Sequence, residues 1–239
     1  MKKILLIIYR IYLYIVIIVS TVIMLGLIFP FVLPFDKSGK ISLKLGILWL
    51  TIIRYASFMK VRVRYDFPAD FTRSYVVVTN HRSHFDVVAL SILPFKAVKP
   101  VAKKELTKMP IFGWFLKKVS IVIDRKAPRG EAYEKIKSQM DKLKKDGFSV
   151  LIFPEGTRGK GSTLLPLKTG AFRLALDYNL PLLPITIKGT EKILPKGSLA
   201  ITPGEVELVV HKPIEVEGVE DYKLLAEKFI KVIEGELKK

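Results

Sequence analysis

The feature that most constrains this chain is an uninterrupted uncharged segment, residues 11–35, in which nearly every side chain is apolar. About 20 apolar residues suffice to cross the hydrocarbon core of a bilayer. The segment exceeds the apolar part of a secretory signal peptide, usually about 7–15 residues, and no small-residue cleavage site follows it. The sequence therefore predicts a membrane-associated protein, and it disfavours a buried helix of a soluble domain.

A second apolar segment, residues 41–58, follows a short polar turn at residues 36–40. Its only charges are Lys44 and Arg54, a pattern that suits a helix at a membrane surface. Basic residues near the amino terminus and the basic remainder of the chain both favour the cytoplasmic side. We therefore favour a helical hairpin, residues 4–58, that enters one leaflet and returns, with a single full span as the alternative.

Two prolines, Pro30 and Pro34, are expected to end the first helix of this hairpin. The predicted organisation is a membrane-anchoring segment at residues 1–59 and a folded domain at residues 60–239.

Composition excludes several classes of protein. Lysine and arginine number 40 against 22 acidic residues, a net charge of +18, and half of the residues are apolar. The chain has no cysteine, which excludes disulfide scaffolds, cysteine nucleophiles and zinc–thiolate or iron–sulfur sites. Only three histidines are present, so a polyhistidine metal centre is disfavoured. Scarce asparagine and glutamine with abundant lysine favour a heat-adapted source, although an AT-rich genome would also enrich lysine.

From residue 60 onward, short apolar runs alternate with amphipathic segments. Continuous apolar strands are typical of a sheet covered on both faces, so we predict an α/β fold with a mostly parallel sheet flanked by helices. The expected strands are residues 61–65, 75–79, 98–102, 120–123, 149–153, 182–187 and 205–210, and the expected helices lie near 85–93, 108–118, 130–146, 168–178 and 220–238.

The first chemically suggestive segment follows the strand at residues 75–79. His81 precedes Asp86 by five residues, which in a regular helix would rotate them about 140° apart. We therefore expect His81 in a loop and Asp86 at the start of the next helix, where the carboxylate would fix the imidazole tautomer. The alternative is structural: His81 caps the helix and Asp86 complements its dipole.

The second suggestive segment follows the strand at residues 149–153. It reads Pro154-Glu155-Gly156-Thr157-Arg158, with a guanidinium and a hydroxyl that suit phosphate oxygens. A solvated loop with a Glu155–Arg158 surface pair is the alternative. The following residues do not form a nucleotide-binding P-loop, because glycine follows Lys160. No serine-hydrolase elbow occurs either.

Together these segments resemble the glycerolipid acyltransferase family, which includes bacterial lysophosphatidic acid acyltransferases. Residues 75–190 carry the resemblance. Besides His81, Asp86 and the FPEGTR block, it rests on Ile121-Val-Ile-Asp124-Arg125, on Leu183-Pro184-Ile185-Thr186-Ile187, and on the segment from Val101 to Leu106 with Met109-Pro110. The chain departs from the family at Ser120, near which glycine is usual.

The resemblance implies transfer of an acyl chain from acyl-CoA or acyl carrier protein to a glycerolipid hydroxyl. His81 would be the general base, oriented by Asp86, and backbone N–H groups near residues 80–83 would be candidate oxyanion donors. The acceptor phosphate would be bound by Arg125, Arg158, Lys103, Lys104 and Thr157. Glu155 would contact the glycerol or hold Arg158, with Gly156 beside the substrate, whereas Arg82 and His84 would be solvated neighbours and His211 has no assigned role. Pro184 and its neighbours are expected to be sheet core.

The implied reaction converts 1-acylglycerol-3-phosphate to phosphatidic acid at the cytoplasmic face of the membrane, with residues 4–58 as the anchor. It needs no tightly bound cofactor and no metal, and its partners are membrane lipids and the acyl donor rather than nucleic acid. One alternative acceptor is glycerol-3-phosphate or another lysophospholipid. A different class of function also fits the charge: a non-catalytic basic membrane protein that binds nucleic acid or anionic lipid.

Overall fold

A computed structural model describes residues 2–124, 126–128, 130–161 and 163–239 of the chain. Its centre is a sheet with the order β1-β7-β6-β2-β5-β3-β4, mostly parallel, as the sequence predicts. Among the named strands of the described residues, β6 and β7 form the one antiparallel pair, while β1 runs parallel to β7. The strands are β1 (Met59–Tyr65), β2 (Val76–Thr79), β3 (Val98–Lys103), β4 (Ile121–Ile123), β5 (Ser149–Ile152), β6 (Leu182–Lys188) and β7 (Gly204–Val210).

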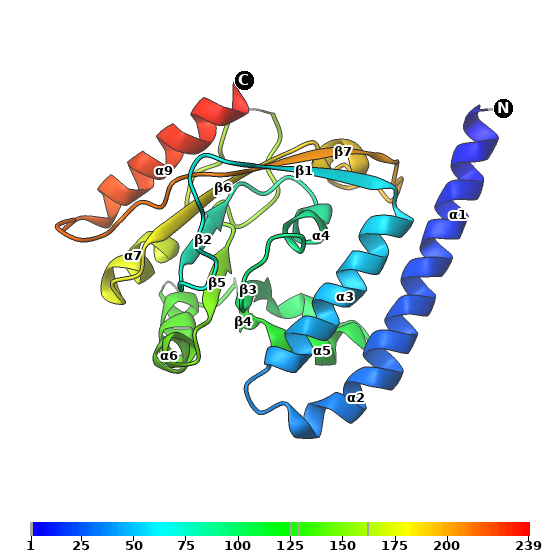
Figure 1. Cartoon of the computed structure of the whole chain (residues 1–239), viewed down its shortest axis with the longest axis horizontal. Coiled ribbons are helices and arrows are strands. Elements are labelled where there is room, and N and C mark those ends of the chain that lie inside the picture. Colours follow the sequence, from blue (N-terminus) through cyan, green and yellow to red (C-terminus); the bar gives the residue numbers. More distant parts are fainter. Residues whose placement is uncertain (1, 125, 129, 162) are drawn as a thin grey trace.

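Helices flank the sheet, and each face has its own apolar core (Figure 1). Odd-numbered residues of β6 such as Ile185 and Ile187 face a core shared with α4 and with the N-terminal helices. The other face is covered by helices that include α6, α7 and α9, with Phe172 and Phe229 in ring contact. The helices of the α/β region are α4 (Phe85–Leu90), α5 (Phe112–Val119), α6 (Glu131–Lys145), α7 (Gly170–Asp177), α8 (Thr190–Ile193) and α9 (Tyr222–Leu237), with a 3₁₀ turn η3 (Lys104–Lys108).

The N-terminal region is a helical hairpin, but Pro30 does not end its first helix. One helical run passes through α1 (Lys2–Thr21), a π-helical stretch η1 (Val22–Ile28), α2 (Phe29–Val32) and a 3₁₀ turn η2 (Leu33–Phe35). Pro30 lies in the first turn of α2, where a missing N–H costs little, so the run continues past it. The prediction that Pro30 ends the helix is therefore wrong; the helical run stops one residue after Pro34.

A capped turn reverses the chain into α3 (Lys40–Ala56). Asp36 is buried and accepts hydrogen bonds from the backbone N–H groups of Gly39, at 2.9 Å, and Ser42, at 2.7 Å. This turn packs on the α/β region rather than projecting from it: a Cβ added to Gly39 would lie 3.5 Å from the carbonyl oxygen of Lys118.

The hairpin is packed on the rest of the molecule along its length. Leu13 of α1 and Ile53 of α3 belong to the same core as the sheet. Further along, Phe29 meets Phe115 of α5 edge to face, with ring centroids 5.3 Å apart.

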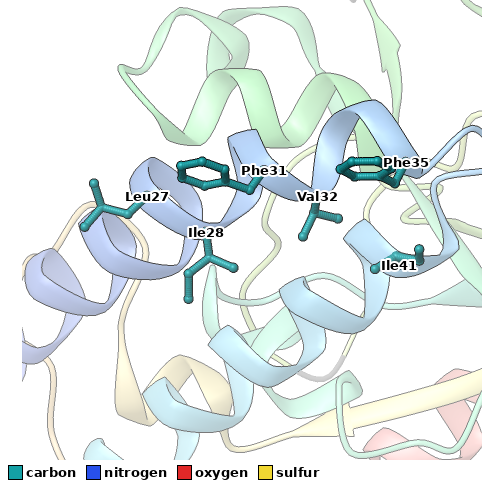
Figure 2. Close-up of a pocket in the computed structure, with 6 residues that line it drawn as sticks. All are labelled: Leu27, Ile28, Phe31, Val32, Phe35 and Ile41. Atoms are coloured by element: carbon teal, nitrogen blue, oxygen red, sulfur yellow. The ribbon is translucent and has the colours of Figure 1, made fainter.

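The outer face of the hairpin is apolar and uncovered. Among the described residues, the run Lys3–Phe35 is the one helix long and apolar enough to cross a membrane. Near the turn, a groove of about 440 Å³ opens between this run and α3 (Figure 2). It is lined by Leu27, Ile28, Phe31, Val32, Phe35 and Ile41.

Candidate active site

The candidate site lies where parallel strands end. β2 is the central strand, hydrogen-bonded to β5 and β6, and all three run in the same direction. The segments that follow them therefore meet at one edge of the sheet: His81 after β2, Glu155 after β5 and Thr190 after β6. Open α/β sheets bind ligands at this edge.

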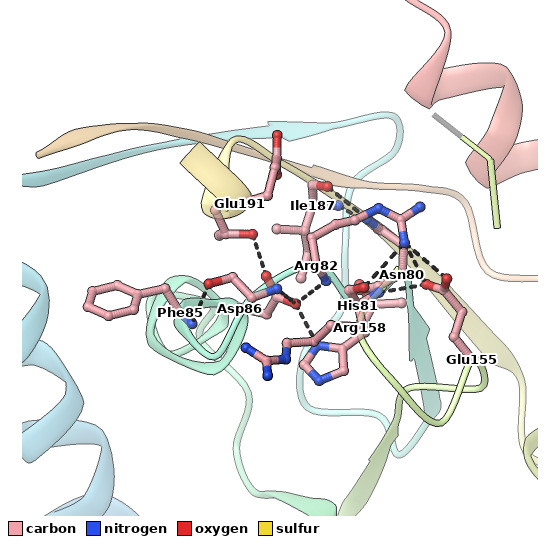
Figure 3. A network of polar contacts seen from close by, with 12 residues as sticks. Asn80, His81, Arg82, Phe85, Asp86, Glu155, Arg158, Ile187 and Glu191 are labelled. Carbon is pink, nitrogen blue, oxygen red and sulfur yellow. Dashed lines mark hydrogen bonds and ion pairs between the residues drawn. The ribbon is translucent and has the colours of Figure 1, made fainter. Parts of the chain in front are cut away.

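His81 and Asp86 form a hydrogen-bonded pair, with 2.6 Å between Nδ1 of the imidazole and Oδ2 of the carboxylate (Figure 3). The loop after β2 and the start of α4 bring them together, in the arrangement that the spacing predicts. Asp86 is fully buried, whereas the His81 side chain is 16% exposed. A carboxylate on Nδ1 fixes the proton there and leaves Nε2 as an acceptor.

The imidazole is supported on one side and open on another. Its ring packs against Phe153, with centroids 4.2 Å apart. Within the described part of the chain, Nε2 has no hydrogen-bond partner. Next to it, the pKa of His84 is lowered by partial desolvation of its ring and by the positive charge of Arg158.

Asp86 has partners on both oxygens. Besides His81, Oδ2 accepts hydrogen bonds from the backbone N–H groups of Arg82, at 2.7 Å, and Ser83, at 3.0 Å. The hydroxyl of Thr190 donates to Oδ1. Hydrogen bonds to the ionised form stabilise a buried carboxylate and hold its orientation.

A buried ion pair lies beneath this dyad. Nη1 of Arg82 is 3.0 Å from each carboxylate oxygen of Glu155, and the two side chains are 2% and 0% exposed. Glu155 also accepts from the backbone N–H groups of His81, at 2.8 Å, and Leu165, at 3.0 Å. Arg82 is therefore not the solvated neighbour expected from the sequence, because its guanidinium is the counter-ion of a buried carboxylate.

The surroundings of Glu155 also differ from expectation. Its oxygens face Arg82 and backbone donors rather than Arg158, and the residue is almost inaccessible. Gly159 closes over the pair: an added Cβ would lie 2.3 Å from Nη1 of Arg82 and 2.7 Å from Oε2 of Glu155. The backbone N–H of Gly159 donates to the carbonyl of His81 at 2.8 Å, which joins the two loops.

Basic side chains gather at the same edge of the sheet. In Figure 3 Arg158 lies on the His81 side of its loop, away from the Glu155 carboxylate. Lys103 and Lys104 stand at the end of β3 in exposed ion pairs with Glu105 and Asp124, at 3.1 and 3.2 Å.

The remaining predicted residues fall in or beside the same loops. Thr157 is exposed, and Gly156 has a positive φ of 67°, a conformation that favours glycine. Arg125 lies outside the residues that the structure describes.

The third histidine belongs to a second, buried histidine–carboxylate pair. Nδ1 of His211 is 2.7 Å from Asp66, and Nε2 is 2.8 Å from the hydroxyl of Thr186. Both ring nitrogens are occupied, so this imidazole lacks the open position that His81 has.

Comparison with known proteins identifies the family of this chain. A family model described as Acyltransferase matches residues 60–188. The chain belongs to the acyltransferase family. The chain is 37% identical over 190 residues to a chloroplastic 1-acyl-sn-glycerol-3-phosphate acyltransferase of Brassica napus, covering 77% of this chain and 54% of that protein. It is 32% identical over 193 residues to the human 1-acyl-sn-glycerol-3-phosphate acyltransferase alpha, covering 78% and 67%.

The fold match extends over the whole chain. The crystal structure of the 1-acyl-sn-glycerophosphate (LPA) acyltransferase PlsC from Thermotoga maritima matches with a TM-score of 0.78 at 26% identity, covering 100% of this chain and 97% of that one. Against the first curated relatives, the chain spans only about half of their length. The family resemblance seen in the sequence is thus confirmed.

Sequence reasoning did not find Thr190, and it named Arg82 at the site but not its role as the counter-ion of Glu155. Thr190 follows the strand block that includes Pro184, which is sheet core as expected. Within the described residues, no cluster of three histidine or acidic side chains could hold a metal ion. What the site offers chemically is an imidazole with one open ring nitrogen, a buried carboxylate that orients it, and cationic groups at the rim.

Proposed function

We propose that this protein transfers an acyl chain from a thioester to the sn-2 hydroxyl of 1-acylglycerol-3-phosphate, which makes phosphatidic acid. The observation that carries the proposal is the His81–Asp86 pair, whose Nε2 is open at an edge of the sheet bordered by Arg158, Lys103 and Lys104. The names of the relatives support the acceptor, since each describes an enzyme that acts on 1-acyl-sn-glycerol-3-phosphate.

His81 acts as the general base. Nε2 takes the proton of the acceptor hydroxyl as its oxygen attacks the thioester carbonyl, and Asp86 stabilises the imidazolium that forms. The tetrahedral intermediate then expels the thiolate of the donor, which takes the proton back from His81. The oxygen–carbon bond of the new ester replaces the carbon–sulfur bond of the thioester, and a free thiol leaves.

The phosphate of the acceptor is bound by cationic side chains at the rim. Arg158 offers a planar fork suited to phosphate oxygens, with Lys103, Lys104 and Thr157 as further donors. Arg125 completes this set in the proposal. Glu155 shapes the loop beside the substrate rather than contacts it, because its oxygens already face Arg82 and backbone N–H groups. Gly156 lies beside the substrate in the proposal.

The donor is acyl-CoA or acyl carrier protein. Both carry a thioester on a phosphopantetheine arm, and both are anionic, so a chain of net charge +18 attracts either one. The reaction uses no tightly bound cofactor, because the acceptor supplies its own nucleophile and His81 supplies the base.

The hairpin holds the enzyme at the membrane from which the acceptor comes. Its polar turn, with Lys37 and Lys40, packs on the α/β region near Lys118, so a turn-first insertion would bury these charges. The outer face of the run Lys3–Phe35 lies side-on in one leaflet instead, with the α/β region, residues 60–239, on the cytoplasmic side. The apolar groove near the turn suits contact with lipid chains.

Product identification tests the proposal. Purified protein in detergent is given an acyl-CoA or acyl carrier protein thioester with 1-acylglycerol-3-phosphate, glycerol-3-phosphate, a lysophospholipid with a larger headgroup, or monoacylglycerol. Mass spectrometry is expected to show phosphatidic acid as the main product and little acylation of monoacylglycerol, which has no phosphate.

The matched variants are His81→Ala and His211→Asn. Loss of the base is expected to lower kcat by about 10²–10⁴-fold, whereas the change at the second histidine leaves it near the parent value. Phosphatidic acid formation by folded His81→Ala at the parent rate would rule out this mechanism, and preferred acylation of glycerol-3-phosphate would reassign the acceptor.

A further inference from the structure

The segment that follows strand β6 contacts the His81–Asp86 pair through the side chain of Thr190. This residue is the first of α8, and its hydroxyl donates a hydrogen bond to Oδ1 of Asp86. Thr190 and Asp86 are both fully buried. They lie 104 positions apart in the sequence, so the contact depends on the fold rather than on the local segment.

The two oxygens of Asp86 are supported unequally. Oδ2 accepts from the imidazole and from two backbone N–H groups of its own loop. For Oδ1, the Thr190 hydroxyl is the hydrogen-bond donor found among the described residues. This hydroxyl therefore fixes the rotation of the carboxylate, which keeps Oδ2 directed at His81, and it draws negative charge toward the side remote from the imidazole.

Thr190 is itself held firmly relative to the loop that carries His81. Gly189 before it has a positive φ of 96°, and an added Cβ there would lie 2.4 Å from the carbonyl oxygen of Glu205 on β7. The side-chain amide of Asn80 bonds both the N–H and the carbonyl of Ile187, each at 2.8 Å. These contacts tie the end of β6 to the start of the His81 loop.

We propose that Thr190 is a positioning residue for the acyl transfer: its hydroxyl orients Asp86 and sets how strongly this carboxylate acts on His81. The role rests on the proposed function, in which His81 is the base. The proposal gives the segment after β6 a role in the reaction, whereas β6 itself is sheet core.

The molecule contains a matched control. Thr186 lies on β6, the strand that precedes Thr190, is also fully buried, and also bonds a histidine–carboxylate pair, but through the His211 imidazole of the second pair. Thr190→Val and Thr186→Val remove the same atom at equal burial and preserve the β-branched shape. Only Thr190→Val removes a hydrogen bond to the His81–Asp86 pair.

The test measures kcat and KM for acceptor and donor, and kcat/KM against pH, for the parent, Thr190→Val, Thr190→Ser and Thr186→Val. Loss of a hydrogen bond to a charged group predicts about a 10- to 100-fold lower kcat for Thr190→Val, with little change in KM. Without the hydroxyl, the full negative charge of Asp86 faces the imidazole and favours its cationic form. The acidic limb of the profile is therefore expected to move to higher pH.

Thr190→Ser is expected to restore kcat and the position of the acidic limb. Thr186→Val is expected to lower stability and to leave kcat and the acidic limb unchanged. An unchanged kcat and acidic limb in folded Thr190→Val would overturn the proposal, as would an equal shift in Thr186→Val. Thr190→Ala removes the hydroxyl without added volume and gives the same test if the valine variant does not fold. Formation of phosphatidic acid by the parent, and its loss in His81→Ala, judge the proposed function separately.

Discussion

Arg82 and Glu155 are opposite charges buried side by side next to His81, the proposed base. Such a pair is costly to form but costlier to break, because removal of one charge leaves the other buried without a counter-ion. Every hydrogen-bond partner found for the Glu155 carboxylate is a donor: the guanidinium of Arg82 and the N–H groups of His81 and Leu165. An amide in its place would turn its NH₂ group toward donors only.

Glu155→Gln is therefore expected to lower the free energy of unfolding by about 3–5 kcal/mol. Glu215→Gln is the matched control, because Glu215 pairs with Arg73 at 2.9 Å on the surface and such pairs contribute about 0–1 kcal/mol. Denaturant unfolding in detergent measures both. Unchanged stability of Glu155→Gln with a raised KM for the acceptor would show that Glu155 contacts the substrate.

The dyad could be predicted from the sequence at this scale, but its supports could not. His81 and Asp86 are five residues apart, so one loop and one helix start suffice to bring them together. Arg82 and Glu155 are 73 positions apart, and each resembles an ordinary solvated charge in the sequence. Thr190 needs the order of β6 and β2 in the sheet, which no local pattern encodes.

At the scale of elements, the hairpin departs from the rule that proline ends a helix, because Pro30 lies in the first turn of a helix. Proline usually ends a helix, yet the π-helical stretch before Pro30 lets a new α-helical turn begin at Phe29. Every strand expected from the sequence is present. The buried strands β2 and β5 are marked clearly by continuous apolar runs. The short helix α8 was not predicted, because four residues carry no periodicity.

The exposed face of α1 gives a test of the side-on placement in the membrane. Ile11 and Ile18 are 57% and 61% exposed and lie seven residues apart on one face. Ile11→Glu with Ile18→Glu leaves the packing on the sheet intact but places two carboxylates where lipid is expected. We expect the protein to move from the membrane pellet to the supernatant, because each charge opposes burial in the leaflet.

Leu224→Glu is the control for this experiment, since Leu224 is 49% exposed on α9, away from the hairpin. Membrane fractionation measures the outcome, and thermal unfolding in detergent checks that each variant is folded. Equal retention of the double variant and the parent in the pellet would contradict the side-on placement. This design is cleaner than deletion of residues 1–58, which would uncover the core that Leu13 and Ile53 share with the sheet.

At the scale of the whole molecule, two regions of charged side chains lie on the sheet, one around His81 and one around His211, and their functions differ. The His81 region borders the proposed substrate site. The other region surrounds His211 and Glu236, where β1, β6, β7 and the end of α9 meet, and it joins the last helix to the sheet. Glu236 is buried, and burial would raise its pKa, but hydrogen bonds from Lys188, Arg64 and Lys239 outweigh this and hold the pKa at about 2.

The second region makes the stability of the fold depend on pH in two separate windows. Burial lowers the pKa of His211 below its usual 6.5, an effect that Asp66 only partly offsets. The unfolded chain then binds a proton more readily than the folded one, so stability is full above pH 6.5 and falls as the pH drops below it. Glu236 affects stability at lower pH. Its contribution to the free energy of unfolding is full above pH 4.5 and is lost toward about pH 2.

We therefore expect the free energy of unfolding to decline between pH 6.5 and 5 in the parent, and less steeply in His211→Asn, which has no titrating group there. The asparagine amide can still donate to Asp66, so the variant tests titration rather than loss of that contact. His84, whose pKa is also lowered, adds the same slope to both proteins and cancels in their difference. Denaturant unfolding in detergent from pH 8 to 5 measures the slopes. Equal slopes in the two proteins would mean that His211 takes up its proton without cost to the fold, and that the junction between α9 and the sheet accommodates a charged imidazole.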